Sequence, residues 1–240
     1  MSPHASRLTP RGFFITGTDT GVGKTLFSAT LLHAFAGLGV RAVGMKPIAA
    51  GAALQDGVWV NEDVALLRAA SAVAAPPELV NPYLFREPIA PHIAAEHKGV
   101  GIELPRIAAA FDELAGLADC VVVEGVGGFR VPLGPERDTA DLAVRLGLPL
   151  ILVVGMRLGC LNHALLTAEA ITARGLRLAA WVANRIDADM AAYDENLSAL
   201  MARLPAPLLA ELPHMRAVDA GAAARLISPR ALQSLYAAGP

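Results

Sequence analysis

Short runs of apolar residues alternate along the chain with longer segments in which apolar residues recur every three or four positions. The apolar runs predict strands at residues 12–16, 40–45, 119–124, 149–154, 178–183 and 208–211. The segments with helical periodicity predict helices at residues 24–38, 61–70, 104–117, 161–174 and 190–203. Strands alternating with helices are typical of a parallel sheet covered on both faces. We therefore expect one α/β domain over residues 1–240, built on a single doubly wound, mostly parallel sheet.

Two segments depart from this alternation. Residues 76–91 contain Asn-Pro-Tyr and Glu-Pro-Ile-Ala-Pro-His, and proline lacks the N–H that regular elements need, so we expect a long ordered loop near a site. Residues 1–11 are expected to form a loose N-terminal extension. Gly39, Gly147 and Gly175 stand where helices are expected to end.

Composition narrows the class of protein. Hydrophobic residues make up 54% of the chain and charged residues 18%, against a usual charged share of about 25%, which favours a large core or a subunit interface and hence an oligomer. The net charge of −2 gives no basic field for nucleic acid. Residues 148–154 are the most apolar run and are too short to span a membrane, which takes about 18 residues. Cys120 and Cys160 form neither a disulfide pattern nor a zinc motif, so a reducing, cytoplasmic location is expected.

The most specific motif lies between the first predicted strand and the first predicted helix. Residues 17–25 read Gly-Thr-Asp-Thr-Gly-Val-Gly-Lys-Thr. Glycines let backbone N–H groups turn towards phosphates, a lysine reaches the outer phosphates, and a hydroxyl binds Mg²⁺; these groups come from Gly21, Gly23, Lys24 and Thr25. Thr18 stands where the common spacing places a glycine, so the loop is a variant one residue longer. The motif predicts binding of Mg·ATP.

Ligands of open parallel sheets bind at the carboxyl ends of the strands, so residues that follow the apolar runs are informative. Glu124 ends the third predicted strand and is the first candidate for a further oxygen ligand of magnesium, although a solvated glutamate is the alternative. Asp63 is the second candidate, or else an acid that stabilises a helix start. Lys46 ends the second predicted strand and could neutralise charge on a transferring phosphoryl group, or be an ordinary surface lysine.

Five motifs follow one another along the chain. They are the phosphate loop at 17–25, Gly-Met-Lys-Pro at 44–47, Glu-Gly-Val-Gly-Gly at 124–128, Gly-Met-Arg-Leu-Gly-Cys-Leu-Asn-His at 155–163 and Trp-Val-Ala-Asn at 181–184. With these motifs in this order, the chain closely resembles the dethiobiotin synthetase family from about residue 13 to residue 215. Related phosphate-loop ATPases share the first motif but not the later ones. The Asn-Pro-Tyr and Ala-Pro-His sequences also look like the long loop of the family.

The resemblance implies a homodimeric enzyme that closes a cyclic urea from 7,8-diaminononanoate, CO₂ and Mg·ATP through a phosphorylated carbamate. Lys24 and Lys46 would stabilise the carbamate and the phosphoryl group, while Thr25, Asp63 and Glu124 would hold Mg²⁺. The nucleotide would contact Gly21, Val22, Gly23, Lys24, Thr25, Leu26, Asp63, Glu124, Gly125, Val126, Gly127, Asn184, Pro213, His214 and Met215, of which Asn184 and the last three lie along the adenine. The substrate would contact Thr18, Lys46, Ala50, Leu158, Gly159, Cys160, Leu161 and Asn162, and the last five would offer N–H groups to its carboxylate across the dimer interface.

Two positions depart from the family pattern. Many members carry a hydroxyl residue where this chain has Ala50, so we expect weaker substrate binding with the chemistry retained. Some relatives carry an acid at Gly21, and its absence is expected to loosen discrimination among nucleoside triphosphates. His92 and His163 are not assigned as general bases, because packing or capping explains them better and a phosphate or carbamate oxygen can accept the proton.

Two alternatives use the same nucleotide fold. ATP-driven switch proteins of plasmid partition and division-site placement carry an extra lysine near the start of the loop, and residues 15–19 contain none. Such a switch also commonly ends in a basic amphipathic helix, which we do not find in the sequence. Amide synthesis on cobalt-corrin side chains needs a glutaminase domain, for which 240 residues leave no room. Dependence of ATP turnover on the diamine and bicarbonate would distinguish these functions.

Overall fold

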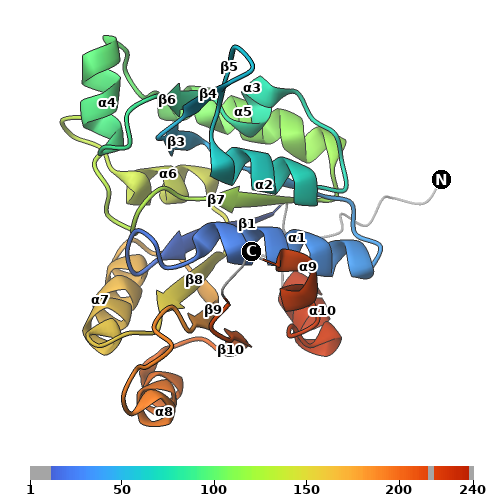
Figure 1. The fold of residues 1–240 in the computed structure, drawn as a ribbon, viewed down its shortest axis with the longest axis vertical. Helices are drawn as coiled ribbons and strands as arrows, with labels where there is room; N and C mark the ends of the chain where they lie inside the picture. The colour runs from blue at the N-terminus through green and yellow to red at the C-terminus, as the bar shows by residue number, and fades with distance from the viewer. Residues whose placement is uncertain (1–11, 216–218, 238–240) are drawn as a thin grey trace.

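The computed structural model describes residues 12–215 and 219–237, and its centre is a six-stranded parallel sheet (Figure 1). The strands are β1 (Gly12–Gly17), β2 (Ala42–Met45), β7 (Cys120–Glu124), β8 (Leu150–Gly155), β9 (Leu178–Asn184) and β10 (Leu208–Leu212). Their order is β10-β9-β8-β1-β7-β2. The chain builds the sheet on one side of β1 and then on the other, so the loop after β1 lies at a topological switch point, where such sheets bind ligands.

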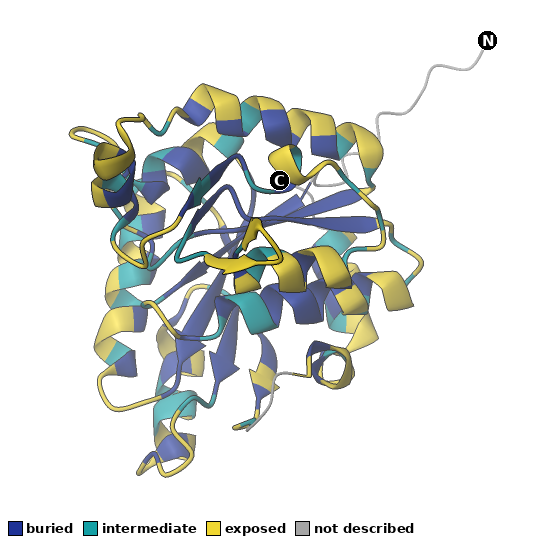
Figure 2. Cartoon of the chain, turned by 45° about the horizontal axis from the view of Figure 1, so that its top comes forward, coloured by how far each residue is buried: buried dark blue, intermediate teal, exposed yellow. Residues whose placement is uncertain are grey.

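Helices cover both faces of this sheet. One face packs against α1 (Lys24–Gly37), α2 (Glu62–Ala70), α9 (Ala220–Ala224) and α10 (Pro229–Ala237), and the other against α5 (Leu104–Leu117), α6 (Thr139–Leu146), α7 (Cys160–Ala173) and α8 (Tyr193–Arg203). Within β1, Phe13 and Ile15 point into the core on the α1 face of the sheet. Phe14 points into the core on the α5 face, since neighbouring side chains in a strand point to opposite faces. The strands are almost wholly buried (Figure 2). The predicted doubly wound α/β fold is confirmed.

All six predicted strands and all five predicted helices are present, with shifted ends. The last predicted helix begins at Tyr193 rather than at residue 190, and the second strand begins at Ala42 rather than at residue 40. Gly147 ends α6 with a φ of 63°, and Gly39 and Gly175 also have positive φ after helices, as predicted. The short helices α6, α9 and α10 were not predicted.

The expectation of a long loop over residues 76–91 was wrong. This stretch contains α3 (Pro77–Val80), β6 (Tyr83–Phe85) and the start of α4 (Pro91–Lys98), and β6 pairs in parallel with β3 (Ile48–Ala50). Both helices have a proline in their first turn, where the missing N–H has no acceptor within the helix and the fixed φ suits helical geometry. Proline therefore starts these elements instead of preventing them.

A short hairpin projects from the molecule between β3 and α2. Its strands are β4 (Ala53–Gln55) and β5 (Val58–Val60), and they pair antiparallel. Asp56 and Gly57 have φ angles of 49° and 80°, as a two-residue type I′ turn requires. Its residues are exposed or half-buried, so neither core holds it in place.

Three further expectations concerned the N-terminus, the cysteines and membrane-spanning segments. The predicted N-terminal extension at 1–11 lies outside the described residues. Cys120 and Cys160 are free and buried. Among residues 12–215 and 219–237, no helix has the length and apolar character needed to cross a membrane.

Candidate active site

The phosphate loop between β1 and α1 has a shape that depends on its glycines. Gly23 precedes α1 with a φ of 90°, a left-handed conformation that favours glycine. A Cβ atom on Gly23 would lie 2.1 Å from Nδ2 of Asn184. Asn184 ends β9, and its Nδ2 donates to the carbonyl of Val22 over 2.8 Å. The predicted nucleotide residue Asn184 thus lies against the phosphate loop.

Lys24 begins α1 and is buried. Its Nζ donates to the backbone carbonyl of Asp19 over 2.9 Å. Burial and, after it, the nearby ammonium of Lys46 together lower the pKa of Lys24 from 10.5 to about 8, against the opposing carboxylates of Glu124 and Asp63. The Lys24 ammonium, which would contact the outer phosphates, therefore begins to lose its proton just above neutral pH.

Four side chains that are far apart in the sequence form one largely buried cluster beside this lysine. Thr25 Oγ1 lies 2.8 Å from Asp63 Oδ1 and 2.8 Å from Glu124 Oε1, and it can donate its proton to only one of them at a time. Lys46 Nζ donates to Asp63 Oδ2 over 2.8 Å and to Glu124 Oε1 over 2.5 Å. Glu124 is fully buried and Lys46 is 3% exposed. The four residues predicted from strand and helix ends are brought together.

The charges of this cluster support one another. Burial acts to lower the pKa of Lys46, but the carboxylates of Glu124 and Asp63 outweigh it and raise that pKa. Burial acts to raise the pKa of Asp63, but Lys46 and the hydrogen bond from Thr25 outweigh it and lower that pKa. With Lys24 counted, two ammonium groups face two carboxylates, and their formal charges cancel, which makes the burial of Lys24, Lys46 and Glu124 tolerable.

The same cluster suits a magnesium ion. Glu124 Oε2 is buried and has no hydrogen-bond partner among the described residues, so one lone-pair-bearing oxygen is available for a cation. Thr25, Asp63 and Glu124 contribute hard oxygen atoms, which Mg²⁺ prefers, and Mg²⁺ usually takes its other ligands from phosphates and water. Among the described residues, no group of three or more His, Cys, Asp and Glu side chains could hold a metal. The hydroxyl of Thr25, 2.8 Å from both carboxylates, would be the third protein ligand.

The proline-rich segment fixes the backbone of Lys46. The Lys46 N–H donates to the carbonyl of Val80 over 2.8 Å. Asn81 Nδ2 donates to the Lys46 carbonyl over 2.6 Å and to that of Tyr83 over 3.1 Å. This role of Asn81 was missed, because the sequence shows only an asparagine before a proline and gives no sign of its tertiary partner.

The glycines after Glu124 lie against the phosphate loop. The Gly125 N–H donates to the Ile15 carbonyl over 2.9 Å. A Cβ on Gly128 would lie 3.6 Å from the Gly17 carbonyl. Thr139 Oγ1 donates to the Phe129 carbonyl over 2.6 Å and so closes this loop from α6. The predicted nucleotide residues at 125–127 therefore lie beside the predicted phosphate site.

The predicted substrate residues lie at the same edge of the sheet. The Gly155 N–H points to Thr18 Oγ1 over 3.4 Å. Arg157 Nη2 contacts Asp19 Oδ2 over 2.6 Å, an ion pair between the two loops that the sequence did not suggest. Gly159 precedes α7, which begins at Cys160, and Leu158 is 94% exposed.

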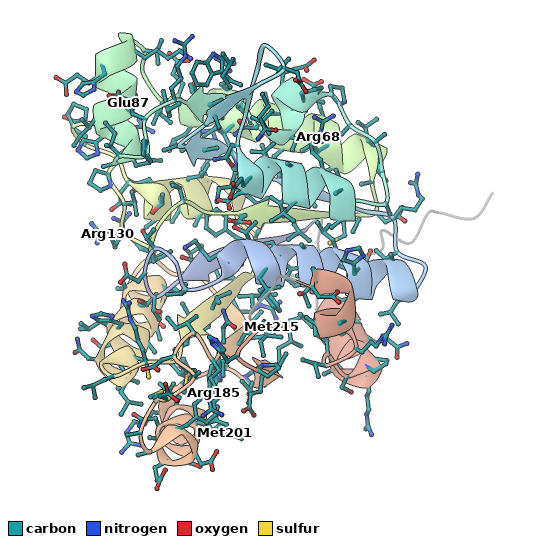
Figure 3. All side chains as sticks on the ribbon, viewed as in Figure 1. Arg68, Glu87, Arg130, Arg185, Met201 and Met215 are labelled. Atoms are coloured by element: carbon teal, nitrogen blue, oxygen red, sulfur yellow. The ribbon has the colours of Figure 1, made fainter. Side chains whose placement is uncertain are left out.

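The predicted adenine residues follow two neighbouring strands. Asn184 ends β9, and residues 213–215 follow β10. The Arg185 N–H donates to the Leu212 carbonyl over 2.9 Å, and His214 Nδ1 lies 3.2 Å from the Arg185 carbonyl. Figure 3 shows Arg185 and Met215 in the same half of the molecule, opposite the half that holds Glu87. The geometry places these residues beside one another, and their contact with adenine stays a prediction.

Comparison with known proteins finds matches over most of the chain. A family model described as an AAA domain matches residues 11–222. The ATP-dependent dethiobiotin synthetase BioD of Aromatoleum aromaticum is 59% identical over 210 residues, which cover 88% of this chain and 93% of that protein.

Solved structures share the fold at much lower identity. The MinD cell division protein of Aquifex aeolicus has a TM-score of 0.57 and 17% identity, covering 93% of this chain and 95% of its own. The septum site-determining protein MinD of Pyrococcus horikoshii, complexed with Mg-ADP, has a TM-score of 0.53 and 16% identity. The match covers 94% of this chain and 92% of that one. At such identity the likeness shows the phosphate-loop α/β fold alone.

Proposed function

The chain belongs to the dethiobiotin synthetase family, and we propose that the cluster around Lys46 is where it closes the cyclic urea of dethiobiotin with ATP. The observation that carries this proposal is the Lys46 ammonium, buried between Asp63 and Glu124 next to Lys24 and the phosphate loop. Ammonium groups held at a largely buried site stabilise developing negative charge more strongly than they would in water.

The reaction needs three bond-forming steps. One amine of 7,8-diaminononanoate attacks the carbon of CO₂ and loses a proton, which gives a carbamate. A carbamate oxygen attacks the γ-phosphorus of ATP, and ADP leaves. The second amine then attacks the carbamoyl carbon, the C–O bond to phosphate breaks, and the ring closes as the departing phosphate takes the proton of that amine.

The residues of the cluster support these steps by binding and orienting charge. Lys24 leaves its contact with the Asp19 carbonyl and donates to the outer phosphates, and Lys46 donates to a carbamate or phosphoryl oxygen. Thr25, Asp63 and Glu124 would hold Mg²⁺, which supplies Lewis-acid stabilisation of the phosphate oxygens when bound. Asn81 holds the backbone of Lys46 and so sets where its ammonium lies.

We further propose that two copies of the chain complete the site. The start of α7 would present N–H groups to the carboxylate of the diamine bound by the partner subunit. The 94% exposure of Leu158, next to this helix start, supports a surface that another copy covers.

The switch function of MinD-like proteins has less support. The fold is shared, but the loop between β1 and α1 has a single lysine, Lys24, and no lysine at residues 15–19. The relative with 59% identity is a synthetase. The function is therefore assigned to synthesis.

A phosphate-release assay with the diamine and bicarbonate tests this function. We expect release by the unmodified chain to require both compounds. Lys46→Ala is expected to lower the rate by about 10²–10³-fold, the usual effect of removing one group that stabilises the transition state.

Loss of Lys46 also leaves Glu124 without its ammonium partner, so the fold of the variant must be checked. Binding of Mg·ADP by Lys46→Ala and its melting temperature serve this purpose, and Arg203→Ala, on the exposed surface of α8, is the matched control. Equal release by Lys46→Ala and the unmodified chain would remove Lys46 from the mechanism, and release that ignores the diamine would contradict the function.

A further inference from the structure

A second cavity, apart from the phosphate loop and the Lys46 cluster, lies between the hairpin, β6 and α4. Its volume is about 500 Å³, within the range of pockets that take small molecules. Its apolar walls come from Trp59, Leu84, Phe85 and Ala94. Phe85 and Ala94 are buried. None of these residues is assigned above to the nucleotide or to the diamine.

Trp59 has no role in the folding core. It lies on β5, belongs to neither hydrophobic cluster and is 36% exposed. The guanidinium carbon of Arg86 lies 4.4 Å from the centroid of its ring, which is a cation–π contact. The Ala52 N–H also donates to the Arg86 carbonyl over 3.0 Å. These contacts hold the hairpin at the cavity wall, where the tryptophan offers an apolar surface to a ligand.

The rim of the cavity carries unbalanced positive charge. Glu87 is its one carboxylate, and Glu87 Oε2 already lies 2.8 Å from Nδ1 of His97. The remaining charged groups of the rim are Arg86 and Lys98. Lys98 Nζ lies 5.8 Å from the centroid of Phe85, so its charge sits beside the apolar wall. Figure 3 shows Glu87 next to α4.

We propose that this cavity binds a medium-chain carboxylate. The hydrocarbon chain would lie against Trp59 and Phe85, and the carboxylate would accept charge-assisted hydrogen bonds from Arg86 and Lys98. An apolar pocket with one cationic end matches a ligand with an apolar chain and one anionic end, and it disfavours a polyanion, which would have to desolvate its charges against aromatic walls.

The proposal is tested by titrating nonanoate into the whole protein and following tryptophan fluorescence and heat. The chain has two tryptophans; Trp181 is fully buried in the sheet, so a ligand-induced change reports on Trp59. A saturable change is expected. Nonanamide has the same chain without the charge. It is expected to bind about tenfold more weakly, because about tenfold in affinity is the usual contribution of one charge-assisted hydrogen bond.

Variants locate the binding. Arg86→Gln keeps the length of the side chain and removes its charge, and it is expected to weaken nonanoate binding about tenfold by calorimetry. Arg203→Gln, on the exposed side of α8, is the matched control and is expected to bind as the unmodified chain does. An unchanged circular dichroism spectrum establishes that Arg86→Gln is folded.

Three results would overturn the proposal. They are the absence of saturable binding by the unmodified chain, equal affinity for nonanoate and nonanamide, and unchanged affinity in Arg86→Gln. The last result, together with displacement of nonanoate by the diamine, would mean that nonanoate binds at the predicted substrate site instead.

Discussion

Lys24 and Lys46 carry the same ammonium group in the same part of the molecule, yet their surroundings move their pKa values in opposite directions. Lys24 is buried with a backbone carbonyl as its partner, and burial lowers its pKa to about 8. For Lys46 the two adjacent carboxylates outweigh burial and raise the pKa. Lys46 thus keeps its charge throughout the physiological range, whereas Lys24 gains its full charge when a phosphate group arrives.

The low pKa of Lys24 predicts proton uptake when nucleotide binds. Above a pH of about 8, Lys24 is largely neutral without ligand, and Mg·ADP or Mg·ATP favours its protonated form. We expect nucleotide affinity to fall as the pH rises past this value. Calorimetry in two buffers with different ionisation enthalpies measures the number of protons taken up.

The variant Lys24→Met is the control for this titration. It should bind nucleotide weakly at every pH and take up no proton at this position. Uptake of the same size in the variant, or none in the unmodified chain above a pH of about 8, would show that another group titrates.

The same shift has a consequence for the stability of the ligand-free protein. Unfolding restores the ordinary pKa of 10.5, so between about 8 and 10.5 the unfolded chain holds more protons on this lysine than the folded chain does. Burial of the charged Lys24 destabilises the folded protein, and this effect is fully present below a pH of about 8. The free energy of unfolding therefore rises as the pH increases from about 8 to 10.5.

Elements with a strong hydrophobic pattern could be predicted from the sequence. Elements that form only because they pair with a distant segment could not. The six strands of the sheet are almost wholly buried and read as apolar runs, so their positions followed from the hydrophobic pattern. The strands β3 and β6 are three residues each and exist because they pair with one another. The same contrast holds in the site: Glu124 and Lys46 end strands, whereas Asn81 and Asp19 act through backbone contacts that leave no pattern.

The fit between the phosphate loop and β9 predicts that two glycines of one loop respond differently to substitution. In Gly23→Ala the new Cβ would meet Asn184 Nδ2 at 2.1 Å, in addition to backbone strain at a φ of 90°. In Gly21→Ala the strain at a φ of 73° remains, but no heavy atom lies within 4 Å of the new Cβ. We expect Gly23→Ala to lose nucleotide binding and Gly21→Ala to weaken it by the backbone cost of about 1 kcal/mol.

Equilibrium binding of a fluorescent ADP analogue measures this difference, and Gly21→Ala serves as the matched control. Equal affinities of the two variants would show that Asn184 moves aside freely. That outcome would remove the contact between β9 and the loop as a determinant of the site.

At the scale of the whole molecule, the exposed apolar surface predicts self-association. Leu158 lies at the carboxyl edge of the sheet beside the predicted carboxylate site and is 94% exposed. We expect a dimer by sedimentation velocity. Leu158→Glu is expected to weaken the dimer at least about tenfold, since it places a charge in an apolar contact, and to raise the KM for the diamine more than that for ATP.

Leu226→Glu is the control for this substitution. Leu226 is 47% exposed and lies between α9 and α10, whose core contacts are on the other face of the sheet. It should leave association and KM unchanged. A monomeric unmodified chain with full activity would contradict the shared site.

The central position of β1 bears on how the protein is made. This strand is synthesised first, yet its neighbours in the sheet are β7, where Gly12 pairs with Val121, and β8, where Phe14 pairs with Leu150. During synthesis on the ribosome, neither edge of β1, which contains Phe13 and Phe14, can pair until about half of the chain has been made. Nucleotide can therefore stabilise the protein only late in folding, and until then this apolar segment is exposed and prone to aggregate.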